Sequence, residues 1–230
     1  MSDTFQIEIE TENTASMLNV HSRFIYKGGN YEFIQYLKNL EIDYRILGSL
    51  NIVFFPEKSS LIYSYSYYDS RYGSYKDTQY TKGKYNGKIY GFLNSLTRYK
   101  AKLEKEKYRF PFLDQLKGIG YGMLVSCICK ALDGGFITLS SNIVLEATGM
   151  MSGMDKEAST VALVNYYEKI GFKQMFPEHY QDAVSKISVP MIARVKDIID
   201  NCNIETFSKE LLDILQIEKC KEIVSMSTLS

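Results

Sequence analysis

Three glycines separated by single residues constrain the fold of this chain more than any other feature. They are Gly118, Gly120 and Gly122, in the run QLKGIGYGML over residues 115–124. Glycine lets the backbone turn tightly and point several N–H groups to one side. Apolar residues at helical spacing follow, so these amides stand at the positive end of a helix dipole, where anions bind. The run predicts a strand–loop–helix unit that holds a pyrophosphate, with Lys117 able to assist.

Glycine runs of this kind also occur in folds that bind different ligands. Rossmann loops use them to bind dinucleotides or methyl donors, but the acidic residue expected about 20 residues further on is not evident. A P-loop is excluded because no Gly-Lys-Ser/Thr follows. A tight turn without any ligand is the remaining alternative.

Hydrophobic patterning predicts a mixed α+β fold. Runs rich in β-branched and aromatic residues are typical of strands. They cover residues 5–10, 50–55, 60–68, 88–93, 108–112, 136–141 and 187–193. The runs at 50–55 and 60–68 predict a hairpin, and the polar stretch 69–84 predicts a loop. Residues 94–107 fit either a helix or a long hairpin.

Apolar residues at helical spacing predict the helices. The helices cover residues 31–40, 119–132, 156–170 and 195–230. Asn30 and Asp155 are suitable N-cap residues for the first and third of them. Gly171 predicts a left-handed residue just after the third helix, with Phe172 folding back onto it.

Three segments resemble those of the GNAT superfamily of acetyltransferases. Residues 115–120 fit the Gln/Arg-x-x-Gly-x-Gly/Ala signature of that family. The segment NYYEKIGF at 165–172 is similar to the family's LYEKLGF, and NGKIYGFL at 86–93 is similar to the strand ahead of its cofactor loop. The segments stand in the family's order and cover roughly residues 50–193.

The resemblance implies a mostly antiparallel central sheet flanked by helices. It places a GNAT-like acetyltransferase domain at residues 1–193 and a C-terminal helical extension at 194–230. The extension either packs on the core or mediates a homodimer, and the sequence leaves both open. The chain departs from the family in two places: an insertion near residues 145–154 and a longer stretch between residues 91 and 115.

The resemblance also implies an N-acetyltransferase that moves an acetyl group from acetyl-CoA to a primary amine by direct attack on the thioester. An amine with a pKa of about 10.4 is protonated at neutral pH, so the site needs a base. Glu104, Glu106 and Asp114 are candidates, and Glu106 is the one we select. Tyr167 matches the family's general acid toward the departing thiolate. The identity of the amine acceptor cannot be inferred from the sequence.

Contacts with acetyl-CoA are assigned by the same resemblance to two stretches. Tyr108, Arg109 and Phe110 run beside the pantetheine arm through backbone hydrogen bonds. The pyrophosphate is held by Gln115, Leu116, Lys117, Gly118, Ile119 and Gly120. Tyr121 and Gly122 lie in the first turn of the helix, next to the pyrophosphate. The alternative is a catalytically inactive GNAT-like module that binds acyl-CoA or a protein partner.

Charge and cysteine content argue against several other functions. The chain has 27 basic and 27 acidic residues, so no broad attraction to nucleic acid or to a membrane surface is expected. The polar N-terminus and the lack of a long apolar run predict neither a signal peptide nor a membrane span. Four irregularly spaced cysteines favour a reduced, cytoplasmic protein. With two histidines and no Cys-x-x-Cys pair, no metal site is expected.

Overall fold

The computed structural model describes most of the chain as two compact units. The described residues are 4–42, 45–55, 64–69, 74–79, 89–98, 103, 106–149, 155–186, 188–203, 205, 207–215, 217, 220 and 222. Unit 1 consists of Met1–Val53, Asn94–Gly135 and Cys202–Ser230, and unit 2 of Phe54–Leu93 and Phe136–Asn201. Each unit is therefore built from stretches that are distant in the sequence.

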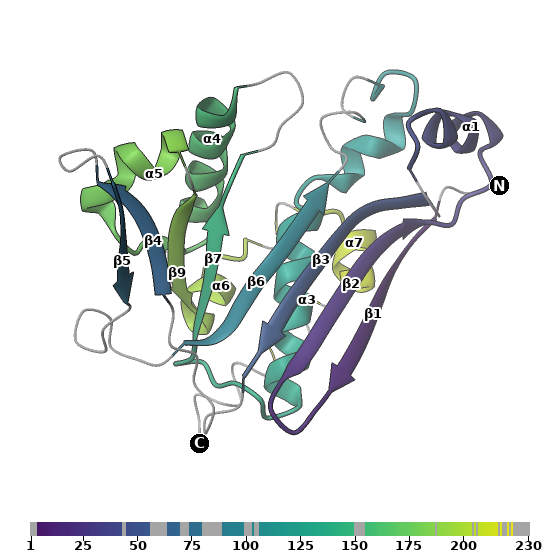
Figure 1. The fold of residues 1–230 in the computed structure, drawn as a ribbon. Coiled ribbons are helices and arrows are strands. Elements are labelled where there is room, and N and C mark those ends of the chain that lie inside the picture. The colour runs from purple at the N-terminus through teal and green to yellow at the C-terminus, as the bar shows by residue number, and fades with distance from the viewer. Residues whose placement is uncertain are drawn as a thin grey trace. The chain divides into compact units, whose positions relative to one another are not determined.

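The fold is α+β, with a mostly antiparallel seven-stranded sheet that is compatible with a GNAT-like mixed fold (Figure 1). The strands of this sheet are β1 (Phe5–Asn13), β2 (Leu18–Tyr26), β3 (Ile46–Phe54), β6 (Ile89–Arg98), β7 (Asn142–Ala147), β8 (Lys173–Gln174) and β9 (Val189–Arg194). Their order is β1-β2-β3-β6-β7-β9-β8. Among the strand pairs whose register is determined, β6 and β7 are parallel, and β1–β2, β7–β9 and β8–β9 are antiparallel.

Helices occupy the segments between these strands. They are α1 (Tyr31–Asn39), α3 (Ile119–Asp133), α4 (Lys156–Lys169), α5 (Tyr180–Lys186), α6 (Val195–Asp200) and α7 (Lys209–Leu215), with 3₁₀ helices η3 (Pro111–Leu116) and η4 (Pro177–His179). A separate two-stranded sheet pairs β4 (Ser64–Asp69) with β5 (Ser74–Gln79). The fold class predicted from the sequence is confirmed.

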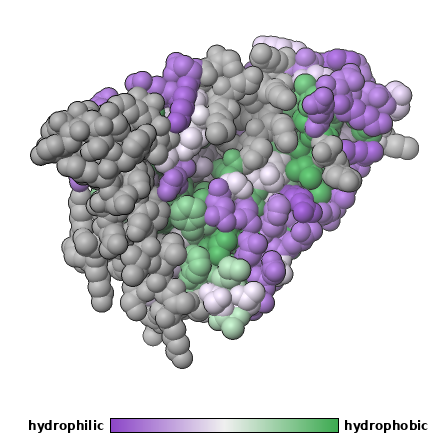
Figure 2. Space-filling model, in the orientation of Figure 1, coloured by the Kyte–Doolittle hydropathy of each residue, from purple (hydrophilic) through white to green (hydrophobic). Residues whose placement is uncertain are grey.

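The sheet in unit 1 has one buried face and one polar face. Alternate residues of β2, among them Val20 and Phe24, are fully buried, and α3 packs against this strand. The intervening side chains form exposed ion pairs, Arg23–Glu10 at 3.0 Å and Lys27–Glu8 at 3.4 Å. Hydrophilic residues accordingly dominate over β1 and β2 in Figure 2. The alternation is the period-two pattern of a half-buried strand.

An aromatic cluster fills the end of unit 1 that contains α1. The Phe33 ring is fully buried, and its centroid lies 4.8 Å from that of Tyr26 and 4.9 Å from those of Phe110 and Phe112. Asn30 Oδ1 accepts the backbone N–H of Phe33 at 3.1 Å. The helix predicted to follow Asn30 is thus confirmed, and its first turn is fixed by this cap and by the rings beneath it.

Unit 2 contains the second capped helix. Asp155 Oδ1 accepts the backbone N–H of Ala158 at 2.8 Å and begins α4. Gly171 has φ +100° after the helix end, and the N–H of Phe172 donates to the Tyr167 carbonyl at 3.0 Å. The predicted N-cap and the predicted left-handed glycine are both confirmed. The predicted strand at 187–193 is present as β9.

Two strand predictions were wrong. Residues 108–112 form a turn and the start of η3, because Pro111 opens a 3₁₀ helix there and Phe110 is buried in the aromatic cluster. Residues 136–141 form no strand, since the Thr138 N–H donates to Ser141 Oγ at 2.9 Å in a local turn. The strand follows this stretch directly, beginning at Asn142 as β7.

The predicted hairpin was also wrong. β3 lies in the large sheet, whereas β4 pairs with β5 inside the stretch 69–84 that was predicted to be a loop. Residues 60–63, 70–73 and 80–84 lie outside the described residues, as does most of 99–105. β2 was not predicted, although Leu18, Val20 and Phe24 carry the alternation that identifies it.

Candidate functional site

Gly118 forms the turn that the glycine run predicts. Its φ of +87° lies in the left-handed region, and α3 begins at the next residue. The N–H of Gly122 donates to the Gly118 carbonyl at 3.0 Å, which closes the first helical turn. Within the described part of the chain, the amides of Ile119 and Gly120 have no hydrogen-bond acceptor. Amides at the start of a helix can bind an anion that reaches them, and here they belong to buried residues.

The residues on either side of this turn differ in their solvent exposure. Gln115 and Leu116 end η3, and the Leu116 side chain is buried. Lys117 is exposed and precedes the turn, so its ammonium group is free to meet an anionic ligand. Tyr121 and Gly122 are buried in the first turns of α3. Ile119 and Gly120 are buried as well, so Lys117 is the exposed residue among 116–122 of the predicted pyrophosphate loop.

Two side chains from the C-terminal part of unit 1 fill the glycine face of α3. A Cβ atom at Gly118 would lie 3.0 Å from Phe207 Cε1, and one at Gly122 would lie 2.3 Å from Leu215 Cδ1. Phe207 and Leu215 are themselves buried. Two of the three glycines therefore have a packing role that needs no ligand, which the sequence interpretation did not include.

Replacing Gly122 with alanine is expected to destabilise the protein by about 1 kcal/mol. In an open helical position the same change stabilises by about 1 kcal/mol, but overpacking against a buried side chain costs about 1–3 kcal/mol. Urea unfolding of the variant measures the sign. In a Leu215→Ala background, which removes the obstructing Cδ1, the same substitution should become neutral or stabilising. A stabilising effect in the wild-type background would contradict the close contact with Leu215.

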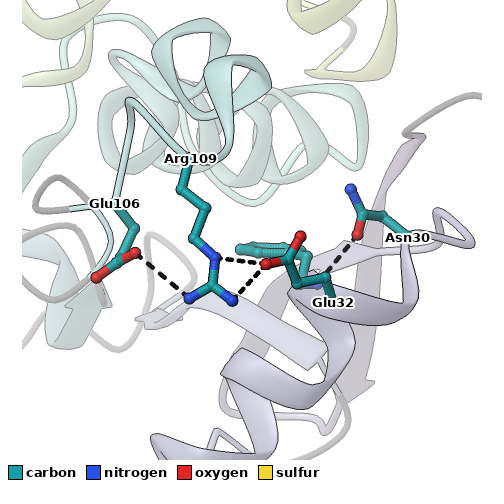
Figure 3. Close-up of polar contacts among 5 residues, drawn as sticks. Asn30, Glu32, Glu106 and Arg109 are labelled. Carbon is teal, nitrogen blue, oxygen red and sulfur yellow. Dashed lines mark hydrogen bonds and ion pairs between the residues drawn. The ribbon is translucent and has the colours of Figure 1, made fainter.

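Arg109 is held by carboxylates from two elements of unit 1 (Figure 3). Its Nε donates to Glu32 Oε1 at 2.7 Å, and its Nη2 contacts the same oxygen. Its Nη1 lies 3.9 Å from Glu106 Oε2, and its guanidinium carbon lies 5.2 Å from the centroid of the Phe110 ring. These contacts tie the turn before η3 to the first turn of α1.

The backbone of this turn is largely committed to internal hydrogen bonds. The N–H groups of Arg109 and Phe110 both donate to the Glu106 carbonyl, at 2.9 and 2.8 Å, and the Phe110 carbonyl accepts from Leu113 at 3.0 Å. The Tyr108 side chain is 89% exposed. A role beside a pantetheine arm stays a prediction for these residues, and Arg109 and Phe110 could supply N–H donors only if the turn opened.

Glu106 lies beside Tyr36 as well as Arg109. The pKa of the Tyr36 phenol is raised, first by burial and then by the Glu106 carboxylate, while Arg109 acts in the opposite direction. The Glu106 side chain is 30% exposed. Glu106 is thus an accessible carboxylate with a cation as its partner, and its use as a general base stays a prediction. Asp114 is exposed on η3, and Glu104 lies outside the described residues.

Tyr167 belongs to unit 2, whereas the other predicted site residues belong to unit 1. It stands near the end of α4 with 7% of its surface exposed. Its ring centroid lies 5.3 Å from that of Tyr166 and 5.7 Å from that of Phe172. The helix end thus fixes the Tyr167 ring by packing. Its role as a general acid stays a prediction.

The cysteines depart from the sequence interpretation. Cys129 on α3 and Cys220 form a disulfide with a Cα–Cα distance of 5.4 Å, whereas Cys127 and Cys202 are buried and form no disulfide. The prediction of four reduced cysteines is therefore wrong for one pair. Their separation of 91 residues gave no local signal of the pairing.

Two cavities, one in each unit, lie away from the glycine run. One of about 650 Å³ in unit 1 is lined by Glu8, Arg23, Lys27 and Arg45 among others, and one of about 670 Å³ in unit 2 lies at the end of α4 near Gly171. The glycine run lines neither of these two.

The described residues contain neither a cluster of metal-ligating side chains nor a helix that could span a membrane. No group of three His, Cys, Asp or Glu side chains gathers there as a metal site requires. No helix in that part of the chain is both long and apolar enough to cross a bilayer. Comparisons with models of protein families, with curated proteins and with solved structures found no match to this chain.

Proposed function

We propose that the protein is an N-acetyltransferase that moves an acetyl group from acetyl-CoA to a primary amine. The observation that carries the proposal is the mixed sheet, in which the parallel pair β6–β7 is joined by a crossover that contains α3. The glycine turn at the start of α3 supports it, since Ile119 and Gly120 present amides without acceptors among the described residues. These features agree with the resemblance of residues 115–120 and 165–172 to the GNAT superfamily.

Each proposed residue has one task in this reaction. Glu106 removes a proton from the acceptor ammonium, and the free amine attacks the thioester carbonyl carbon. The carbon–sulfur bond then breaks, and Tyr167 donates its proton to the departing thiolate, while the proton that the acetylated nitrogen loses restores the Tyr167 hydroxyl. The amides at the start of α3 and the Lys117 side chain hold the pyrophosphate of the coenzyme. The proposed compartment is the cytoplasm, where acetyl-CoA and amines are both present.

A second function is favoured by one observation, the occupation of the glycine face by Phe207 and Leu215. A non-catalytic GNAT-like module would keep the sheet and use these glycines only for internal packing. It would bind acyl-CoA or a protein partner without turnover. The ion pairs of Arg109 with Glu32 and Glu106 fit this alternative too, because Glu106, the proposed general base, is already paired with Arg109.

Binding and turnover separate the two functions. Titration calorimetry with coenzyme A, with S-adenosylmethionine as the control ligand, should give binding of coenzyme A alone. Acetyl-CoA with a panel of amines should then release free thiol at a rate that depends on the amine. Binding without amine-dependent thiol release would favour the module. Absence of coenzyme A binding in both oxidised and reduced protein would overturn the acetyltransferase and the acyl-CoA-binding form of the module.

A further inference from the structure

Described residues of the C-terminal segment, defined here as residues 202–222, contact one face of α3. Phe207 meets Gly118, Leu215 meets Gly122, and the Ser126 hydroxyl donates to the Leu215 carbonyl. One helical turn further on, Cys129 is bonded to Cys220. The α3 positions 118, 122, 126 and 129 are spaced by four, four and three residues, which places them on one face of a helix.

Docking of this segment depends on the contacts with its neighbours. The contact side chains Leu211, Leu215, Ile217 and Cys220 are at most 1% exposed. The one helix of the segment with determined bounds, α7, has seven residues, too few to be stable alone in water. Its structure therefore requires the surfaces of α3 and β1, against both of which it packs, and the disulfide is the covalent part of its attachment to α3.

We propose that the Cys129–Cys220 disulfide is a redox latch that holds Phe207 and Leu215 on the glycine face of α3, and that its reduction frees this face. The further claim that coenzyme A binding is gated by the latch rests on the proposed function. Phe207 occupies the space beside Gly118 at the helix start, which is open because glycine has no Cβ atom. A pyrophosphate bound there would need the same space. The segment and the ligand therefore compete.

The chemical step is a two-electron exchange with a dithiol reductant. A thiolate of the dithiol attacks one sulfur, and the second thiol of the reductant resolves the mixed disulfide. The products are the Cys129 and Cys220 thiols and the oxidised, cyclic reductant. Cys129 is only partly buried and Cys220 almost wholly, so attack begins at Cys129. Disulfides in a reducing compartment are usually transient and regulatory, which agrees with a latch in the proposed cytoplasmic location.

Cys127 provides a control because it takes no part in the latch. Burial raises the pKa of the Cys127 thiol to about 12, with the nearby Ser22 hydroxyl acting in the opposite direction. A thiol with that pKa stays protonated at neutral pH and reacts slowly with disulfides. Cys127→Ala therefore changes a buried thiol on the same helix, two residues from Cys129, and leaves the latch intact.

Hydrogen exchange tests the latch without reference to any ligand. Peptides covering residues 117–126 and 207–217 are compared in oxidised protein and after treatment with dithiothreitol, in the wild type, Cys220→Ser and Cys127→Ala. Reduction should speed exchange of these peptides about tenfold or more in the wild type and Cys127→Ala, because local opening sets the exchange rate. Cys220→Ser should exchange at the fast rate in both conditions. Equal rates in oxidised and reduced wild-type protein would overturn the latch.

Coenzyme A titrations in the same two conditions test the gating. Tighter binding to the reduced wild type, with no redox dependence in Cys220→Ser, supports it. Faster exchange with equal coenzyme A affinity in both states would overturn the gating and leave the proposed function standing. Faster exchange with no coenzyme A binding in either state would overturn the proposed function and leave the latch standing.

Discussion

Replacing Tyr167 with phenylalanine is expected to lower turnover of acetyl-CoA with an amine by about 10²–10⁴-fold, the range typical of losing a general acid. The departing thiolate then has no proton donor, whereas the ring keeps its packing against Tyr166 and Phe172. Coenzyme A binding should change little. Steady-state thiol release gives the turnover, and calorimetry gives the affinity.

Tyr166→Phe is the matched control for this prediction. It removes a phenolic oxygen from the adjacent residue of α4, and turnover should stay close to that of the wild type. Full turnover in Tyr167→Phe would show that this hydroxyl is not the acid. An equal loss in both variants would assign the effect to the packing of the helix end rather than to proton transfer.

Phe33→Ala is expected to lower the free energy of unfolding by about 3–5 kcal/mol, the usual cost of removing a fully buried aromatic ring. The cost is high because the rings of Tyr26, Phe110 and Phe112 all lose the same partner, whose centroid lies 4.8–4.9 Å from each of theirs. Urea unfolding followed by circular dichroism measures the change.

Tyr31→Ala provides the comparison for Phe33→Ala. Tyr31 lies two residues earlier on α1 and is 73% exposed, so its loss should cost within about 0.5 kcal/mol. Phe33→Leu, which keeps most of the buried volume, should fall between the two. Comparable losses for Tyr31→Ala and Phe33→Ala would mean that the aromatic cluster does not stabilise unit 1 as its burial indicates.

Helix ends were predictable from the sequence because their signals are local. The side chains of Asn30 and Asp155 each accept a hydrogen bond from the amide three residues further on, and Gly171 supplies the positive φ after α4. None of these features depends on residues distant in the chain. The α+β class followed in the same way from the alternation of strand and helix patterns.

Features decided by distant residues were not predictable. Residues 108–112 have the composition of a strand, but Phe110 is drawn into a cluster with Tyr26 and Phe33, more than 70 positions earlier. The same holds for the glycine run. A phosphate and a phenylalanine ring both require a backbone without Cβ, so Gly118 predicts a close approach without identifying what approaches.

The discontinuity of unit 1 has a consequence for synthesis on the ribosome. Unit 2 is complete once residue 201 has left the exit tunnel, whereas unit 1 still lacks Phe207, Leu215 and the second half of its cross-link. Nascent chains fold from the N-terminus as residues emerge, so the earliest strands of this protein wait longest for their final partners. The strands β1 and β2 therefore belong to the unit that is finished later.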